Sequence, residues 1–238
     1  MNVRYFKNYE ELSRYGADLL KSSLHGLGEP VLCAASGHSP SLLYHYFVES
    51  IRGDEDYVQK LKILALDEWL GLSKGDPNSC ESYLKKFLVD PLKIEDDRFL
   101  RFRSNPNNPG AECQRMKNVV DDLLPLDVTV LGIGKNGHIG FNEPSTSLSP
   151  FCHVTELSRE SMQHSMAQEM DEIPKYGIIL GMSEILNSKK ILLLATGKGK
   201  KDVIREFLDG KITSKNPSTF LLLKNQTEFL IDEESLAG

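Results

Sequence analysis

Short apolar runs that do not alternate with polar residues are the feature that most constrains the fold of this chain. The clearest runs are VLCAAS (31–36), LKILALDEW (61–69), DVTVLGIG (127–134) and KKILLLATG (189–197). A strand buried on both faces is apolar throughout, whereas a strand with one wet face alternates. Amphipathic segments separate the runs, so the pattern predicts an α/β fold of three layers, with a mostly parallel sheet and helices on both faces.

The segments between these runs predict the helices. Ser39 is the expected N-cap and Pro40 the first helical residue of the helix that follows the first run. The predicted helices span residues 9–25, 39–51, 79–92, 112–124, 159–168, 183–186 and 200–210. Further short strands are expected at residues 99–103, 153–157 and 176–181, and the first twenty residues are interpreted as one amphipathic helix.

Length and charge limit what the protein can be. We expect one domain over residues 1–238, with a formal net charge of −6 that argues against nucleic acid as a partner. No apolar stretch is long enough for a membrane span or has the layout of a signal peptide, so a cytoplasmic location is expected. The cysteines lack the spacing of a metal site; they are Cys33, Cys80, Cys113 and Cys152.

Parallel α/β sheets bind ligands beyond the carboxyl ends of their strands, so the loops that follow the runs hold the candidate site. Residues 36–40, SGHSP, join a strand to a helix N-terminus, where Ser36, Ser39 and free amides can bind an anion. A plain turn is the equal alternative. Asp67 ends the second run and is either a general base or a turn residue.

Lysines and glycines follow the fourth run in TGKGKKD, residues 196–202. The segment lacks the spacing of a Walker A loop, but a lysine here can bind a phosphate. A solvated first helical turn is the alternative, and the helix dipole disfavours lysine there. The sequence therefore favours a functional lysine at this position.

The segment LGIGKNGHIGFNEP, residues 131–144, contains the pattern G-x-G-x-x-G of dinucleotide-binding proteins. That pattern must open a long helix, which Gly140 and Pro144 prevent here. The glycines therefore shape a loop that carries His138 and, five residues later, Glu143. A histidine beside a carboxylate is an acid–base pair that works near neutral pH, so this pair is favoured over a structural histidine.

The segments LDEWLGL, GIGKNGHIGFNEP and TGKGK resemble the aminosugar-6-phosphate deaminase/isomerase family, whose fold is shared with 6-phosphogluconolactonases. The resemblance covers nearly the whole chain, and it is strongest for the galactosamine-6-phosphate branch, with the glucosamine-6-phosphate branch next. It implies a modified Rossmann-like fold without a nucleotide. It also implies isomerisation coupled to deamination of a small-molecule sugar phosphate, with neither cofactor nor metal.

The same resemblance implies roles for individual residues. Asp67 would move a proton between C2 and C1 of the sugar, and His138, oriented by Glu143, would open the sugar ring. Lys200 would bind the phosphate. The remaining substrate-binding residues implied are Ser36, Gly37, His38, Ser39, Gly134 and Gly137.

Two positions depart from the family pattern. Asn136 stands where glucosamine-6-phosphate deaminases have an aspartate, which we interpret as pointing to the galactosamine branch. The phosphate-binding arginine of the glucosamine enzymes falls near Ala167 in this chain, and His164 and Gln163 are the candidates to replace it. Three alternatives stay open: a 6-phosphogluconolactonase, a nicotinamide oxidoreductase and a non-catalytic sugar-phosphate sensor. A homo-oligomer is also left open.

Overall fold

The computed structural model describes residues 1–163, 170 and 172–237. Within this part of the chain, the strands are β1 (Asn2–Phe6), β2 (Val31–Ala34), β3 (Lys62–Ala65), β4 (Asp67–Leu70), β5 (Phe99–Leu100), β6 (Leu126–Gly132), β7 (His153–Glu156), β8 (Tyr176–Ile179), β9 (Ser188–Ala195) and β10 (Thr227–Asp232). The α-helices are α1 (Tyr9–Leu24), α2 (His38–Ile51), α3 (Glu55–Val58), α4 (Cys80–Leu84), α5 (Asp90–Leu92), α6 (Pro109–Leu123), α7 (Arg159–Met162), α9 (Met182–Leu186) and α10 (Lys201–Leu208). A π-helical turn, η1 (Lys85–Val89), joins α4 to α5, and the 3-10 helices are η2 (Asp96–Arg98), η3 (Pro217–Leu223) and η4 (Glu234–Leu236).

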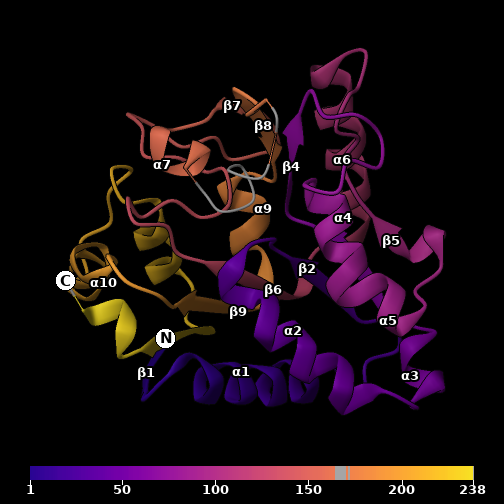
Figure 1. Ribbon diagram of the computed structural model, residues 1–238, viewed down its shortest axis with the longest axis horizontal. Coiled ribbons are helices and arrows are strands. Elements are labelled where there is room, and N and C mark those ends of the chain that lie inside the picture. The colour runs from indigo at the N-terminus through magenta and orange to yellow at the C-terminus, as the bar shows by residue number, and fades with distance from the viewer. Residues whose placement is uncertain (164–169, 171, 238) are drawn as a thin grey trace.

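Seven strands form a central sheet in the order β1-β10-β9-β6-β2-β3-β5, and every neighbouring pair is parallel. The predicted α/β fold with a mostly parallel sheet is therefore confirmed. The first and last strands, β1 and β10, lie side by side, so both chain ends lie at the same edge of the sheet (Figure 1).

Alternate residues of each central strand enter two separate hydrophobic cores. In β2, Leu32 and Ala34 pack with α1 and α2 on one face, whereas Val31 and Cys33 pack with α6, α9 and α10 on the other. Both faces are dry, which is why these strands contain no polar alternation. Figure 1 shows α1 and α2 on one side of the sheet and α6 and α9 on the other.

A second, antiparallel sheet of three strands, β4-β8-β7, was not predicted. The sequence predicted one strand over residues 61–69, but the chain leaves the central sheet at Leu66. The backbone N–H of Leu66 donates to Ala34 in β2, and its carbonyl accepts from Leu180 at the end of β8. Leu66 thus connects the two sheets, and Asp67 begins a strand of the second one.

Two further expectations are corrected, and a third lies partly outside the described residues. Residues 2–6 form the edge strand β1 rather than part of a helix, because they pair with β10 in parallel register. Helix α2 begins at His38 with Gly37 as its N-cap, so Ser39 is not the cap. Of the helix predicted over 159–168, α7 accounts for Arg159–Met162, and residues 164–168 lie outside the described residues.

Candidate active site

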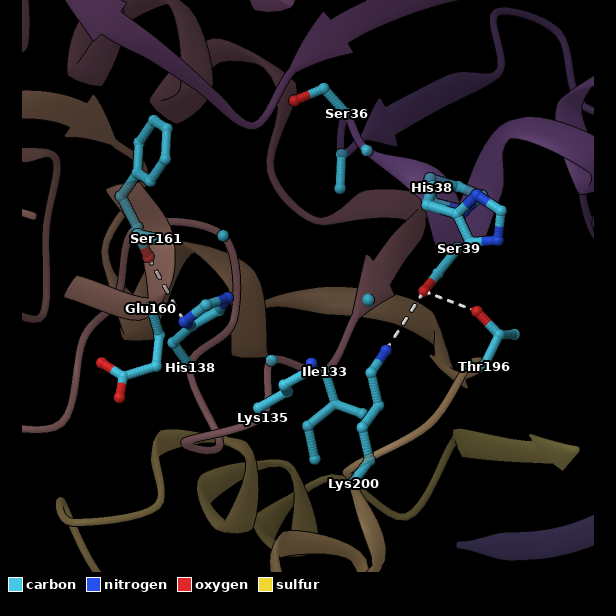
Figure 2. A pocket seen from close by; sticks show the side chains of 18 of the residues that line it. Ser36, His38, Ser39, Ile133, Lys135, His138, Glu160, Ser161, Thr196 and Lys200 are labelled. Atoms are coloured by element: carbon cyan, nitrogen blue, oxygen red, sulfur yellow. Dashed lines mark hydrogen bonds between the residues drawn. The ribbon is translucent and has the colours of Figure 1, made fainter. Parts of the chain in front are cut away.

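A cavity of about 700 Å³ opens at the carboxyl ends of β2, β6 and β9. Residues from six segments of the chain surround it. They are Ala35, Ser36, Gly37, His38, Ser39, Pro40, Asp67, Trp69, Gly132, Ile133, Gly134, Lys135, His138, Gly140, Phe141, Glu160, Ser161, Gln163, Thr196, Gly197, Lys198, Lys200 and Glu234. Figure 2 shows His138 and Ser161 on one side of the cavity and Ser39, Thr196 and Lys200 on the other.

Asp67 lines this cavity although only 4% of its surface is exposed. Burial and the neighbouring Glu68 raise the pKa of Asp67 to about 7, against the opposing effects of the Cys80 thiol and the Phe141 N–H. Its Oδ1 atom has no hydrogen-bond partner among the described residues. A buried carboxylate with a free oxygen and a pKa near neutrality is suited to accept a proton from a ligand.

The shape of the cavity wall beside Asp67 depends on Gly140. This residue has a φ of 53°, and a Cβ there would lie 2.6 Å from Asp67 Oδ2. Any larger residue would therefore push the carboxylate away. The rings of Trp69 and Phe141 meet edge to face with their centroids 4.7 Å apart, and both residues line the cavity.

Glu68, the next residue, has a structural role. Its carboxylate accepts hydrogen bonds from the backbone N–H groups of Trp69, Cys80 and Glu81 at 2.8–2.9 Å. Burial raises the pKa of Glu68 to about 7, although these three donors oppose the rise. Glu68 does not line the cavity and instead binds the N-terminus of α4. Adjacent strand residues point to opposite faces, so Asp67 faces the cavity and Glu68 faces α4.

His138 lies on the loop that follows β6, and a turn fixes its place. The N–H of Gly134 donates to the carbonyl of His138 at 3.0 Å, and the Asn136 side chain accepts from the His138 N–H at 3.0 Å. The imidazole ring lies against Gly134, where a Cβ would be 2.3 Å from Nε2. Glycine at 134 is thus required for the position of the ring.

Glu143 lies behind His138 and does not line the cavity. Its Oε2 is 3.5 Å from His138 Nδ1, and its Oε1 accepts from the Ser161 hydroxyl at 2.5 Å and the Ser158 N–H at 3.1 Å. Burial alone would raise the pKa of Glu143, but His138 and these donors lower it to about 2. Glu143 is therefore an anion that faces the side of the imidazole opposite the cavity.

The other end of the cavity presents donors for an anion. Gly37, with a φ of 115°, is the N-cap of α2, and no side chain among the described residues caps the first turn. The Oγ of Ser39 accepts from Thr196 at 2.8 Å and from Lys200 Nζ at 3.5 Å. Burial lowers the pKa of Lys200 to about 8. Free amides at a helix N-terminus together with a lysine form an anion site.

The structure brings most of the predicted site residues to this one cavity. Those that line it are Ser36, Gly37, His38, Ser39, Asp67, Gly134, His138 and Lys200. Those that do not are Asn136, Gly137 and Glu143. Gly137 packs against Asn216, and its carbonyl accepts from the Ser218 N–H. Asn136 donates to Glu143 Oε2 at 3.4 Å, which places it beside the pair formed by His138 and Glu143.

Sequence reasoning missed several residues of the cavity, notably Ser161, Lys135, Glu160 and Thr196. Ser161 carries no motif, and only its position three residues after the cap Ser158 marks it. Gln163 lines the cavity, whereas His164 and Ala167 lie outside the described residues.

In residues 1–163, 170 and 172–237, no group of three or more His, Cys, Asp or Glu side chains is arranged to hold a metal ion. No helix in the same ranges is both long and apolar enough to span a membrane.

Comparison with known proteins gives matches along nearly the whole chain. The family model described as glucosamine-6-phosphate isomerases/6-phosphogluconolactonase matches residues 8–230. The Escherichia coli K12 protein named "Putative deaminase AgaI" is 38% identical over 230 residues, which cover 97% of this chain and 91% of that protein. Glucosamine-6-phosphate deaminase 1 of Bacillus subtilis is 34% identical over 237 residues, 99% of this chain and 98% of that protein.

A solved structure is also closely similar. The structure of a monomeric glucosamine-6-phosphate deaminase superposes with a TM-score of 0.92 at 35% identity. The superposition covers 98% of each chain. The similarity thus extends over both sheets rather than over the central sheet alone.

Proposed function

Because this chain belongs to the glucosamine-6-phosphate isomerase/6-phosphogluconolactonase family, we propose that it is an aminosugar-6-phosphate isomerase/deaminase. Its preferred reaction converts galactosamine 6-phosphate and water to tagatose 6-phosphate and ammonia. The alternative substrate is glucosamine 6-phosphate, which gives fructose 6-phosphate. The observation that carries the proposal is that Asp67, His138 and Lys200 line one cavity.

Phosphate binding takes place at the end of the cavity formed by α2 and Lys200. The free amides at the start of α2 and the ammonium of Lys200 bind the phosphoryl oxygens, and Gly37, His38 and Ser39 surround them. Ser36 lines the same cavity. The phosphate thereby supplies binding energy remote from the reacting carbons, which orients the sugar.

Ring opening is the task of His138. The imidazole transfers a proton to the ring oxygen, and C1 becomes an aldehyde. Glu143 lies 3.5 Å from Nδ1, on the side of the ring away from the cavity, and orients the imidazole. Asn136 and the turn that contains Gly134 and Gly137 hold the loop in place.

Isomerisation and deamination are the task of Asp67. Once the aldehyde has formed, the C2 proton is acidic, and the carboxylate removes it to give an enolamine. Asp67 returns the proton to C1 and O1 takes a proton from the amino group, which leaves a hydroxyl on C1 and an imine at C2. Water adds to this imine, ammonia leaves, and the ketose 6-phosphate remains. One carboxylate serves both carbons because C1 and C2 are adjacent.

The galacto preference rests on the motifs that resemble the galactosamine branch, including Asn136. A cytoplasmic location is proposed with it, because the four cysteines are free thiols, as expected in a reducing compartment. The segment Phe141-Asn142-Glu143-Pro144 argues against the lactonase alternative, because the family's lactonases have a different sequence at this point.

The decisive experiment incubates the protein with galactosamine 6-phosphate and with glucosamine 6-phosphate separately, and measures ammonia and ketose phosphate. We expect both products from at least one substrate, with faster release from the galacto epimer. The Asp67→Asn variant is the control, and it should bind substrate without exchanging the C2 proton with solvent. Hydrolysis of 6-phosphogluconolactone without ammonia release from either aminosugar would replace this proposal with the lactonase.

A further inference from the structure

Ser161 is a buried residue of α7 that sits between the two members of the acid–base pair. Only 3% of its surface is exposed. Its Oγ lies 2.5 Å from Glu143 Oε1 and 3.4 Å from His138 Nδ1. Figure 2 shows the contact between Ser161 and His138, with the second ring nitrogen directed toward the cavity.

The direct contact between His138 and Glu143 is long. Their closest atoms, Nδ1 and Oε2, are 3.5 Å apart, beyond the usual N–H···O range of about 2.7–3.2 Å. The Ser161 hydroxyl lies at nearly the same distance from Nδ1, 3.4 Å, but it also contacts Glu143 Oε1 closely, at 2.5 Å. The hydroxyl therefore offers a second connection between the imidazole and the carboxylate.

The direction of these hydrogen bonds follows from counting hydrogens. Glu143 has a pKa of about 2, so it is ionised near neutral pH and can only accept. Ser161 has one hydroxyl hydrogen, and it must donate that hydrogen to Glu143. Toward His138 the same oxygen can then only accept, so the hydrogen between them belongs to Nδ1.

Asn136 and Ser158 provide the other hydrogen bonds of this group, and neither of them is a recorded partner of His138 Nδ1. Asn136 Nδ2 lies 3.4 Å from Glu143 Oε2 and 3.4 Å from Ser158 Oγ, and Asn136 Oδ1 accepts from the backbone N–H of His138. The Ser158 N–H donates to Glu143 Oε1. Among the described residues, Ser161 and Glu143 are the two recorded side-chain partners of Nδ1.

We propose that Ser161 is a positioning residue that fixes the tautomer of His138 through the chain Nδ1–H to Ser161 Oγ–H to Glu143. Nε2 is then the unprotonated nitrogen that faces the cavity. This inference rests on the proposed function and specifies its ring-opening step. Nε2 removes the proton from O1 of the cyclic sugar, the C1–O1 bond becomes a carbonyl, and the C1–O5 bond breaks. The electron pair passes to O5, which takes the proton from Nε2.

The test combines nitrogen-15 NMR of labelled histidine with steady-state kinetics for the wild type, Ser161→Ala and Ser161→Thr. A His138→Gln variant assigns the signals. In the neutral imidazole, the wild type and Ser161→Thr should show a proton on Nδ1 and none on Nε2. Ser161→Ala should show both tautomers, since its Nδ1 is left with one acceptor at 3.5 Å. Its kcat should fall about tenfold with KM nearly unchanged, and threonine should restore the rate.

Two results would overturn the inference. One is a wild-type signal from the Nε2–H tautomer. The other is an alanine variant with the wild-type tautomer and kcat, which would mean that Glu143 alone orients the ring. The NMR measurement needs no substrate, so it separates this inference from the proposed function. Absence of ammonia release with the Nδ1–H tautomer present would refute only the function.

Discussion

Replacing Asp67 with asparagine should make the protein more stable near neutral pH while it abolishes turnover. Burial and Glu68 raise the pKa of Asp67 from its ordinary 3.8 to about 7. Between these two values the folded protein binds a proton that the unfolded chain has already lost. The free energy of unfolding contributed by this residue therefore falls as the pH rises from about 4 to about 7.

The magnitude follows from the two pKa values. A difference of about three pKa units corresponds to roughly 4 kcal/mol at about 1.36 kcal/mol per unit. The asparagine side chain carries no charge in either the folded or the unfolded state, so the variant escapes this loss. Oδ1 has no partner among the described residues in the wild type, so the substitution breaks no described hydrogen bond at that atom. We expect the variant to gain up to about 4 kcal/mol over the wild type above pH 7, relative to their difference at pH 4.

The assay is urea unfolding of both proteins at half-unit steps from pH 4 to pH 8. In the difference between the two unfolding free energies the other titrating groups cancel, which leaves residue 67 together with its interaction with Glu68. Turnover of the wild type should rise with pH through about 7 as Asp67 loses its proton. If the two stability curves run parallel from pH 4 to pH 8, Asp67 has no raised pKa and the reasoning is refuted.

Two other predictions concern the loops around the cavity. In Gly134→Ala, the new Cβ would lie 2.3 Å from His138 Nε2, so kcat in the ammonia assay should fall about 100-fold. The control is Gly28→Ala, where the new Cβ would have no atom within 4 Å, and its kcat should equal that of the wild type. Lys135 lines the cavity near Gly199, and its charge adds to burial in lowering the pKa of Lys200. Lys135→Met should therefore raise the KM for the sugar phosphate about tenfold, whereas substitution of the exposed Lys201 by Met should leave the KM unchanged. Equal KM values for the two variants, both shown by calorimetry to be folded, would contradict a role of Lys135 in phosphate binding.

The sequence predicted the fold class and the location of the candidate residues because both have local signals. Apolar runs such as 31–36 mark strands that are buried on both faces, and each is followed by a loop that must lie at the carboxyl edge of the sheet. That rule selected Ser36, Asp67 and His138 before any tertiary information was used. The same reasoning missed Ser161, since one serine in a short helix carries no local signal.

The errors have a shared cause. Residues 63–66 are uniformly apolar up to Asp67, so nothing local shows that the chain changes sheets at Leu66. That change is set by backbone partners at Ala34 and Leu180, which are distant in the sequence. The cap of α2 was misassigned for a similar reason, because the Ser39 hydroxyl accepts hydrogen bonds from Thr196 and Lys200, which are distant in the sequence.

By itself, the sequence determined the layers of this protein and which loops carry its chemical groups, because burial and chain reversal leave periodic, local patterns. Only the tertiary structure decided that Asp67 is buried beside Glu68 and that Glu143, Ser161 and His138 form one connected group. Protonation states and hydrogen-bond directions depend on the environment created by segments far apart in the chain. A linear pattern of residues does not contain that environment. The environment exists only once the two sheets have packed.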